Sequence, residues 1–226
     1  FSASATEALN TILRGIEWKD GYSVYVTPFE HNAVLRVLRY LQSIYCLQIR
    51  ELAVDKESMT YDLEAIKYQF QESKPNVVIL THASNVCGLI TPIEEICRLA
   101  KKYDAICIVD MAQTAGLIPT DLNQIPVDFA VFSGHKTLYG PFGIGGFILD
   151  RNVSLKPFIY GGTGTDSANP DMPTVIPDRF EAGSSNILSI AGLNAALKWI
   201  NKTSIERIRN IEFNNLRMLL NVLREF

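Results

Sequence analysis

The chain has 226 residues, of which 47% are hydrophobic and 20% are charged. This composition is typical of a globular protein with a large apolar core, and no stretch requires a membrane span. The formal net charge is −3 and no basic block stands out along the chain, which argues against nucleic acid as a partner.

The four cysteines are spread through the chain without CxxC or Cys/His spacing. They are Cys46, Cys87, Cys97 and Cys107. Each lies among apolar residues, so we expect buried free thiols in a reducing compartment, the cytoplasm. The histidines lack a short-range ligand pair as well, and no metal site is predicted.

The first predicted element is a helix that begins at about Ser4. Apolar residues from Ala5 to Ile16 recur at helical spacing, and Ser4 followed by Glu7 forms a capping box. A helix N-terminus offers free N–H groups and the positive end of the helix dipole, which suit an anion. The alternative is an ordinary capped helix without a ligand.

His31 stands between a short apolar strand, residues 22–26, and a helix whose buried stripe covers residues 34–44. Residues 30–34 read EHNAV. An imidazole at such a corner can stack on a flat ligand and can move protons. The alternative is a capping or hydrogen-bonded polar residue.

Two apolar strands in the middle of the chain each end in polar residues. The strand at residues 77–80 runs into THASNVCG, residues 81–88, and the strand at residues 105–109 delivers Asp110. A carboxylate at the end of a buried strand is costly unless a cation pairs with it. A Mg²⁺ ligand of a nucleotide-binding protein is the alternative for Asp110, but no GxxxxGK[ST] loop accompanies it. A further strand is predicted over residues 47–54, and helices are predicted over residues 61–71 and 92–103.

Residues 128–146 read DFAVFSGHKTLYGPFGIGG and join predicted strands at residues 129–132 and 147–149. Lys136 follows directly on the first of these strands. Because strand ends in α/β sheets open into the crevice where ligands bind, Lys136 is the candidate nucleophile. A lysine condenses with an aldehyde to give a Schiff base. The alternative is a surface lysine in a turn.

The last third of the sequence changes in character. Residues 160–167 and 170–177 are rich in Gly, Pro and small polar residues, which predicts a long loop near the site. Residues 179–186 read RFEAGSSN, and two helices are predicted over residues 187–200 and 205–223.

Strands and helices alternate up to residue 149, which predicts a mainly parallel sheet with helices on both faces, a three-layer α/β/α fold. The candidate residues follow the strands or lie near the start of the chain. We therefore expect one site at the carboxyl edge of the sheet.

Six ordered strings together resemble class V aminotransferases and cysteine desulfurases, a family of fold-type I enzymes that use pyridoxal phosphate (PLP). The resemblance implies a large domain with a seven-stranded sheet at residues 1–203, and a connector helix at residues 204–226 toward a mostly absent C-terminal domain. Since the sequence opens on Phe1 and ends on Phe226 in a helical pattern, we expect a longer chain. The strings are SATE (4–7), EHNAV (30–34), THASNVCG (81–88), DMAQTAG (110–116), SGHK (133–136) and RFEAGSSN (179–186).

The resemblance also implies a role for each candidate residue. Lys136 would form the Schiff base and move protons, and His31 would lie over the cofactor ring, so these two are the predicted catalytic residues. Asp110 would pair with the pyridinium nitrogen of PLP. The other predicted cofactor contacts are Ala5, Thr6, Ser133 and His135 at the phosphate, Asn85 and Gln113 at the phenolic oxygen, and Ser184 at the phosphate of the partner subunit's cofactor. The last contact implies a homodimer.

The strings EHNAV, SGHK and RFEAG are most similar to those of cysteine desulfurases and selenocysteine lyases. This resemblance implies removal of sulfur from L-cysteine to give L-alanine and an enzyme persulfide, with a sulfur-acceptor protein as a further partner. None of the four cysteines occupies a recognisable persulfide-loop position. Two alternatives stay open: another class V PLP enzyme, such as an aminotransferase, selenocysteine lyase or amino-acid lyase, and a non-catalytic PLP-fold dimerisation module.

Overall fold

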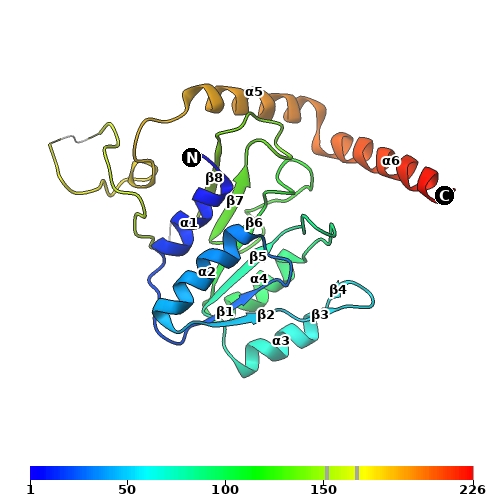
Figure 1. Cartoon of the computed structure of the whole chain (residues 1–226), viewed down its shortest axis with the longest axis horizontal. Helices are drawn as coiled ribbons and strands as arrows, with labels where there is room; N and C mark the ends of the chain where they lie inside the picture. Colours follow the sequence, from blue (N-terminus) through cyan, green and yellow to red (C-terminus); the bar gives the residue numbers. More distant parts are fainter. Residues whose placement is uncertain (151–152, 166–167, 226) are drawn as a thin grey trace.

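A computed structural model describes residues 1–150, 153–165 and 168–225 of the chain (Figure 1). Six strands form its central sheet: β1 (Ser23–Val26), β2 (Gln48–Glu51), β5 (Val77–Thr81), β6 (Ile106–Asp110), β7 (Phe129–Ser133) and β8 (Gly145–Leu149). Their order across the sheet is β2-β1-β5-β6-β7-β8. All neighbours are parallel except β7 and β8, which are antiparallel.

The prediction of seven strands is wrong, because the central sheet has six in the described part of the chain. Among the described residues, the outer edge of β8 pairs only with Ser2, which exchanges two backbone hydrogen bonds with Gly145 at 3.0 and 2.8 Å. One bridge is too short to count as a strand. A separate antiparallel pair, β3 (Val54–Asp55) and β4 (Thr60–Tyr61), stands apart from the central sheet.

Helices cover both faces of the sheet, so the predicted three-layer α/β/α arrangement is confirmed. The helical elements are α1 (Ala5–Gly15), α2 (Asn32–Tyr45), α3 (Leu63–Glu72), α4 (Ile93–Lys101), the 3₁₀ helix η1 (Asp178–Phe180), α5 (Ile187–Thr203) and α6 (Ile205–Leu223). None of the helices in the described residues is both long enough and apolar enough to cross a lipid bilayer.

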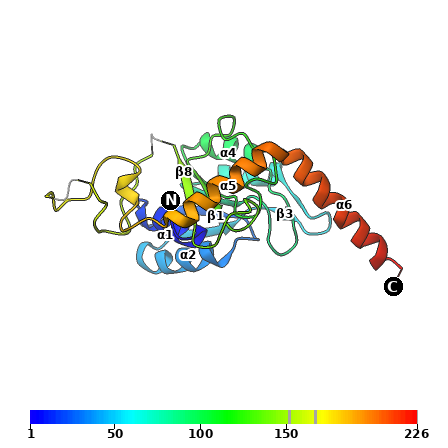
Figure 2. The same ribbon diagram turned by 90° about the horizontal axis from the view of Figure 1, so that it is seen from above.

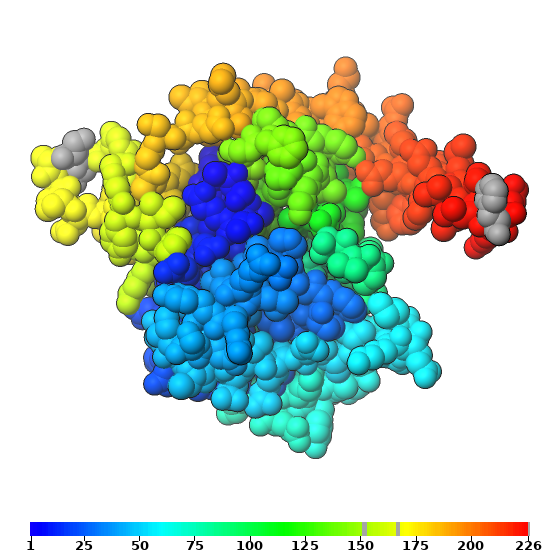
Figure 3. Space-filling view, in the orientation of Figure 1, coloured from blue at the N-terminus to red at the C-terminus, as the bar shows by residue number. Residues whose placement is uncertain are grey.

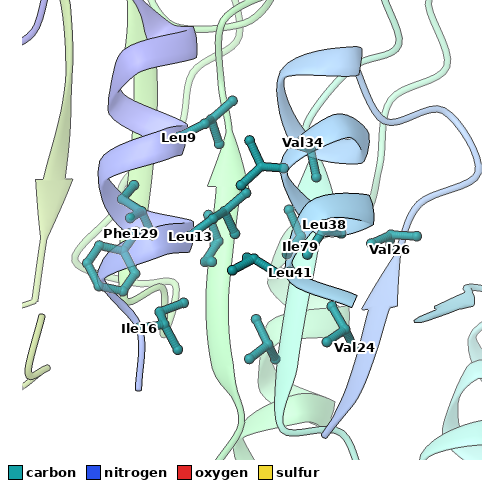
Figure 4. Close-up of a cluster of buried hydrophobic side chains, with 14 of the residues drawn as sticks. Leu9, Leu13, Ile16, Val24, Val26, Val34, Leu38, Leu41, Ile79 and Phe129 are labelled. Atoms are coloured by element: carbon teal, nitrogen blue, oxygen red, sulfur yellow. The ribbon is translucent and has the colours of Figure 1, made fainter. Parts of the chain in front are cut away.

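Two large cores lie between the sheet and the helices on its opposite faces, because successive side chains of a strand point to opposite faces, and a third, smaller core lies beneath α5. Val77 and Ile79 of β5 pack in the core beneath α1 and α2, which Figure 4 shows in close-up. Val78 and Leu80 pack in the second core, against α3 and α4. This continuous burial explains why the strand reads as an unbroken apolar run.

The end of the chain is less integrated. Residues 153–165 and 168–186 form an irregular segment that holds η1 and projects from the body of the molecule (Figures 1 and 3). The predicted loop includes residues 166–167, which lie outside the described residues. Helix α5 crosses the molecule (Figure 2), and α6 extends away from it with Ile208 as its one buried residue. The role of α6 as a connector stays a prediction.

Candidate active site

A cavity of about 220 Å³ lies at the carboxyl ends of β5, β6 and β7, beside the first residues of α1 and α2. Nine of the ten site residues predicted from the sequence line it, and Ser184 is the exception. The nine are Ala5, Thr6, His31, Asn85, Asp110, Gln113, Ser133, His135 and Lys136. The fold therefore gathers side chains from distant parts of the sequence into one hollow.

The N-terminus of α1 forms one wall of the cavity. Ser4 caps the helix, and its hydroxyl accepts a hydrogen bond from the N–H of Glu7 at 3.2 Å. The Glu7 carboxylate accepts the N–H of Ala3 at 3.2 Å, one residue before the N-cap, so the Ser4 half of the predicted capping box is confirmed and the return bond goes to Ala3 in place of Ser4. Within the described residues, no acceptor contacts the N–H groups of Ala5 and Thr6. These two donors and the helix dipole are free to bind an anion.

Gly145 allows α1 to approach the sheet this closely. A Cβ atom at this position would lie 2.6 Å from the carbonyl carbon of Ser4 and 2.7 Å from the nitrogen of Ala5. Both contacts are with backbone atoms, which cannot swing aside as a flexible side chain can. Any larger residue would therefore displace the start of α1 from the cavity.

His31 forms a second wall as the N-cap of α2. Its Nδ1 accepts the N–H of Ala33 at 3.1 Å, which orients the ring and leaves the proton of the neutral imidazole on Nε2. The capping role weighed as an alternative is confirmed, and His31 lines the cavity as well.

Asp110 is the last residue of β6 and is 6% exposed. Its Oδ1 accepts the N–H of Ala112 at 2.9 Å. Burial raises the pKa of Asp110, while the Ala112 N–H, the Lys136 ammonium and the His31 ring act in the opposite direction. No cationic side chain in the described ranges lies within ion-pair distance of it. A buried acid in this setting suits a ligand that presents a cationic N–H group.

Lys136 lies in the turn after β7 and is exposed at the cavity. The residues before it form a polar corner, in which the Ser133 hydroxyl lies 3.4 Å from Nδ1 of His135. The His135 ring stacks on Phe142 with 4.7 Å between ring centroids. The corner is therefore held in place by contacts within the chain, beside the primary amine of Lys136.

Asn85 and Gln113 line the cavity from the turns that follow β5 and β6. Ser184 is exposed and lies elsewhere, at a hollow of about 250 Å³ that Ser2 and Gly143 also line. This placement is consistent with a residue that serves the site of a neighbouring subunit, and that role stays a prediction.

Some residues at the site were not singled out from the sequence. Thr81, Ala33 and Ala112 line the cavity, and the Glu30 carboxyl lies buried beside Thr81. Their positions in the sequence could have indicated them. Glu30, Ala33 and Ala112 lie within two residues of a predicted site residue, and Thr81 ends a buried strand. Nothing in their side-chain chemistry distinguished them.

His82, for which the sequence indicated no role, is a buried support of the site. It is 4% exposed, and its Nδ1 lies 2.9 Å from the hydroxyl of Thr114. Burial lowers the pKa of His82 to about 4, so the ring is neutral at neutral pH. The contact joins the end of β5 to the turn that carries Gln113.

The prediction of four buried thiols is wrong for two of them. All four cysteines are free, and Cys97 and Cys107 are buried, but Cys46 and Cys87 are exposed. Cys46 ends α2 in a left-handed conformation with φ 49°, and Cys87 lies in the turn after β5. Both belong to connections that run over the surface whatever their apolar neighbours in the sequence.

Comparisons with known proteins agree with this geometry. The family model of aminotransferase class-V matches residues 1–226. A probable cysteine desulfurase from Pyrococcus abyssi is 34% identical over 218 residues, which make up 94% of this chain and 54% of that protein. The apo structure of a cysteine desulfurase from Thermococcus onnurineus has a TM-score of 0.88 at 29% identity, over 99% of this chain and 57% of that chain.

A third comparison shows the same fold at lower identity. A variant of C-DES with glycine covalently linked to its PLP cofactor has a TM-score of 0.80 and 23% identity, over 92% of this chain and 57% of that chain. The chain spans about half the length of the curated relatives it matches. Since the family model matches along the whole sequence, the chain belongs to the aminotransferase class-V family.

Proposed function

We propose that the protein binds PLP in the 220 Å³ cavity. Three features of the cavity fit three groups of this cofactor. The free N–H groups at the start of α1 suit its phosphate, the buried Asp110 suits its protonated ring nitrogen, and the Lys136 amine suits its aldehyde. Family membership and the PLP named for C-DES support the assignment.

The observation that carries the proposal is the meeting of Asp110 and Lys136 in one cavity. Asp110 is buried and has no ion-pair partner among the residues that the structure describes, and the Lys136 ammonium is close enough to lower its pKa. When bound, PLP supplies an electron sink for charge that develops at the α-carbon of an amino acid. Asp110 then holds the proton on the ring nitrogen, and Lys136 moves the proton at the substrate α-carbon.

The remaining residues bind and orient the cofactor. The His31 ring, oriented by the hydrogen bond that its Nδ1 accepts from the Ala33 N–H, would stack on the flat ring of PLP and help to hold it. We assign the phosphate to Ala5, Thr6, Ser133 and His135, the phenolic oxygen to Asn85 and Gln113, and the phosphate of the partner subunit's cofactor to Ser184.

The reaction we propose is removal of sulfur from L-cysteine to give L-alanine and a persulfide on an enzyme thiol. The names of the Pyrococcus abyssi and Thermococcus onnurineus relatives support this choice. None of the four cysteines lines the cavity, so we assign the receiving thiol to none of them.

We further propose a cytoplasmic homodimer that passes its sulfur to an acceptor protein. In this proposal residues 1–203 are the PLP-binding domain and residues 204–226 connect it to a smaller domain. The position of Ser184 away from the cavity supports the homodimer, and the four free thiols support a reducing compartment.

The test is to add PLP to the full chain and record the visible spectrum before and after borohydride. L-cysteine and a reductant follow, with assays for sulfide and alanine. We expect a borohydride-sensitive band that the Lys136→Ala variant loses, and sulfide and alanine in equal amounts. Lys156→Ala is the matched control, because Lys156 pairs with Glu17 away from the cavity at 2.7 Å.

Other outcomes would assign a different function. A Lys136-dependent band without sulfide would favour another class V reaction, such as transamination or a different lyase reaction. Absence of the band from the full chain would contradict a catalytic role and favour a non-catalytic module that keeps the fold.

A further inference from the structure

Glu30 is a buried carboxyl group between the ends of β1 and β5, immediately before His31. The residue is 7% exposed. Its Oε1 accepts two hydrogen bonds, one from the Thr27 hydroxyl at 2.7 Å and one from the Thr81 N–H at 2.6 Å. Its Oε2 is buried and has no hydrogen-bond partner within the described residues. One side chain thus joins the loop after β1 to the end of β5.

The different lengths of β1 and β5 explain why an acceptor is needed here. The pairing of these strands ends at Val26 and Ile79, whereas β5 continues to Thr81. On its other edge, β5 remains paired with β6 as far as Thr81 and Asp110. The Thr81 N–H therefore faces a position that β1 has left, and the Glu30 carboxyl replaces the missing strand carbonyl.

We propose that Glu30 is a positioning residue for the cofactor site. Its carboxyl group fixes the position of the end of β5 relative to the start of α2. Glu30 adjoins His31 along the chain, and Thr81 adjoins Asp110 across the sheet. The link therefore connects the ring-stacking residue to the buried acid. This inference rests on the proposed use of the cavity for PLP.

The surroundings keep the Glu30 carboxyl neutral. An ionised Oε2 would be a buried charge without a donor. Burial raises the pKa of Glu30 to about 8, more than the hydrogen bonds from Thr27 and Thr81 lower it, and Asp110 adds to the rise. The groups that face it are these three residues and the Tyr61 phenol.

The test compares Glu30→Gln, Glu30→Ala and Glu30→Asp in the full chain. Gln keeps an oxygen for both hydrogen bonds, so we expect PLP affinity within about threefold of the unmodified protein. Ala removes the acceptor, and the shorter Asp carboxyl does not reach the Thr27 hydroxyl and the Thr81 N–H, so each variant is expected to weaken PLP binding by about tenfold or more. Should the Ala variant fail to fold, the pair Gln and Asp decides the same question.

A matched control comes from β1, the strand that precedes the Glu30 loop. Tyr25→Phe removes a buried hydroxyl that contacts the carbonyls of Gln69 and Ser73, each at 2.8 Å, on the α3 side of the sheet. We expect it to lower stability without changing PLP affinity. Equal affinity for PLP in Glu30→Ala and the unmodified protein, or equal losses in Glu30→Ala and Glu30→Gln, would overturn the proposal.

A second measurement uses the protein without PLP. The pKa of Glu30 is about 8 in the folded chain and 4.5 in the unfolded chain. The unfolded chain therefore releases this proton at lower pH than the folded chain does. The stability of the unmodified protein, measured relative to Glu30→Gln, should therefore fall between about pH 4.5 and pH 8 and change little above.

The two proposals fail in different ways. Identical pH dependence in the unmodified protein and Glu30→Gln would show that the carboxyl is not held neutral and would overturn the inference, even where PLP binds normally. Absence of PLP binding from every variant, the unmodified protein included, would overturn the proposed function and with it the role of Glu30 at a cofactor site.

Discussion

A buried aspartate lies at each end of the parallel strands, one at the carboxyl ends (the carboxyl edge) and one at the amino ends (the amino edge), and the two side chains have different surroundings. Asp110 at the carboxyl edge and Asp128, just before β7 at the amino edge, are both 6% exposed. Asp128 accepts the Cys107 N–H at 2.6 Å and pairs with the Lys101 ammonium at 2.5 Å. Asp110 accepts the Ala112 N–H, and no cationic side chain in the described part of the chain lies within ion-pair distance of it. The same residue at the same burial stabilises the fold at one edge and stays available for a ligand at the other.

The largest effect is expected from Asp110→Asn. Because the variant cannot hold a proton on the cofactor ring nitrogen, we expect PLP affinity and turnover to fall by about 100-fold or more. The apo protein should be at least as stable as the unmodified one, since the amide carries no buried charge. Fluorescence titration with PLP and denaturant unfolding would measure the two quantities. Normal PLP affinity in this variant would contradict the assignment of Asp110.

Asp128→Asn is expected to show the opposite pattern. Loss of the ion pair with Lys101 should lower the free energy of unfolding by about 2–3 kcal/mol, below the cost for a fully enclosed pair because the Lys101 side chain is 31% exposed. PLP affinity of the folded variant should not change. A variant that keeps its stability but loses PLP would erase the contrast between the two edges.

His82, near the carboxyl edge, should make the stability of the protein depend on pH. Its pKa is about 4 in the fold and 6.5 in the unfolded chain, so the unfolded chain binds more protons between these values. The contribution of neutral His82 to the free energy of unfolding is complete above about pH 6.5 and is lost as pH falls toward 4. The loss is about 1.4 kcal/mol per pKa unit and about 3 kcal/mol at most. Unfolding curves from pH 7 to pH 4 would measure the loss. The His82→Gln variant, which cannot take up this proton, should show a shallower dependence.

The smallest effect concerns the thiols. Hydrogen bonding by Ser84 lowers the pKa of Cys87, which is exposed beside the carboxyl edge, whereas the buried contact with Cys107 raises the pKa of Cys97. Iodoacetamide at pH 7 should therefore label Cys87 rapidly and Cys97 only after unfolding. Peptide mass spectrometry after timed quenching would measure the order in which the cysteines are labelled. Early labelling of Cys97 would contradict the packing of α4 on β6.

Much of the site could be predicted because parallel strands end at one edge. Apolar runs at residues 77–80 and 105–109 located β5 and β6, and the polar residue after each run had to lie at the same side of the sheet. The Ser4 and Glu7 pattern located the start of α1 for a similarly local reason, since capping involves neighbours three residues apart.

Exposure and strand count depended on contacts that no local pattern contains. Cys46 and Cys87 have apolar neighbours in the sequence, yet both lie on turns, where the path of the backbone places them at the surface. In the described ranges, the side of β8 that faces away from β7 pairs only with Ser2, and that pairing joins residues far apart along the chain.

Glu30 shows the division between the two levels most clearly. Its neighbour His31 carried a recognisable chemistry, and the sequence was enough to place an imidazole at a strand-to-helix corner. The bond from the Thr81 N–H to the Glu30 carboxyl exists only because β1 stops short of β5, and the register of two strands is a property of the folded sheet. Local order along the chain decided which groups reach the carboxyl edge, while packing across the sheet decided which of them are paired, buried and neutral.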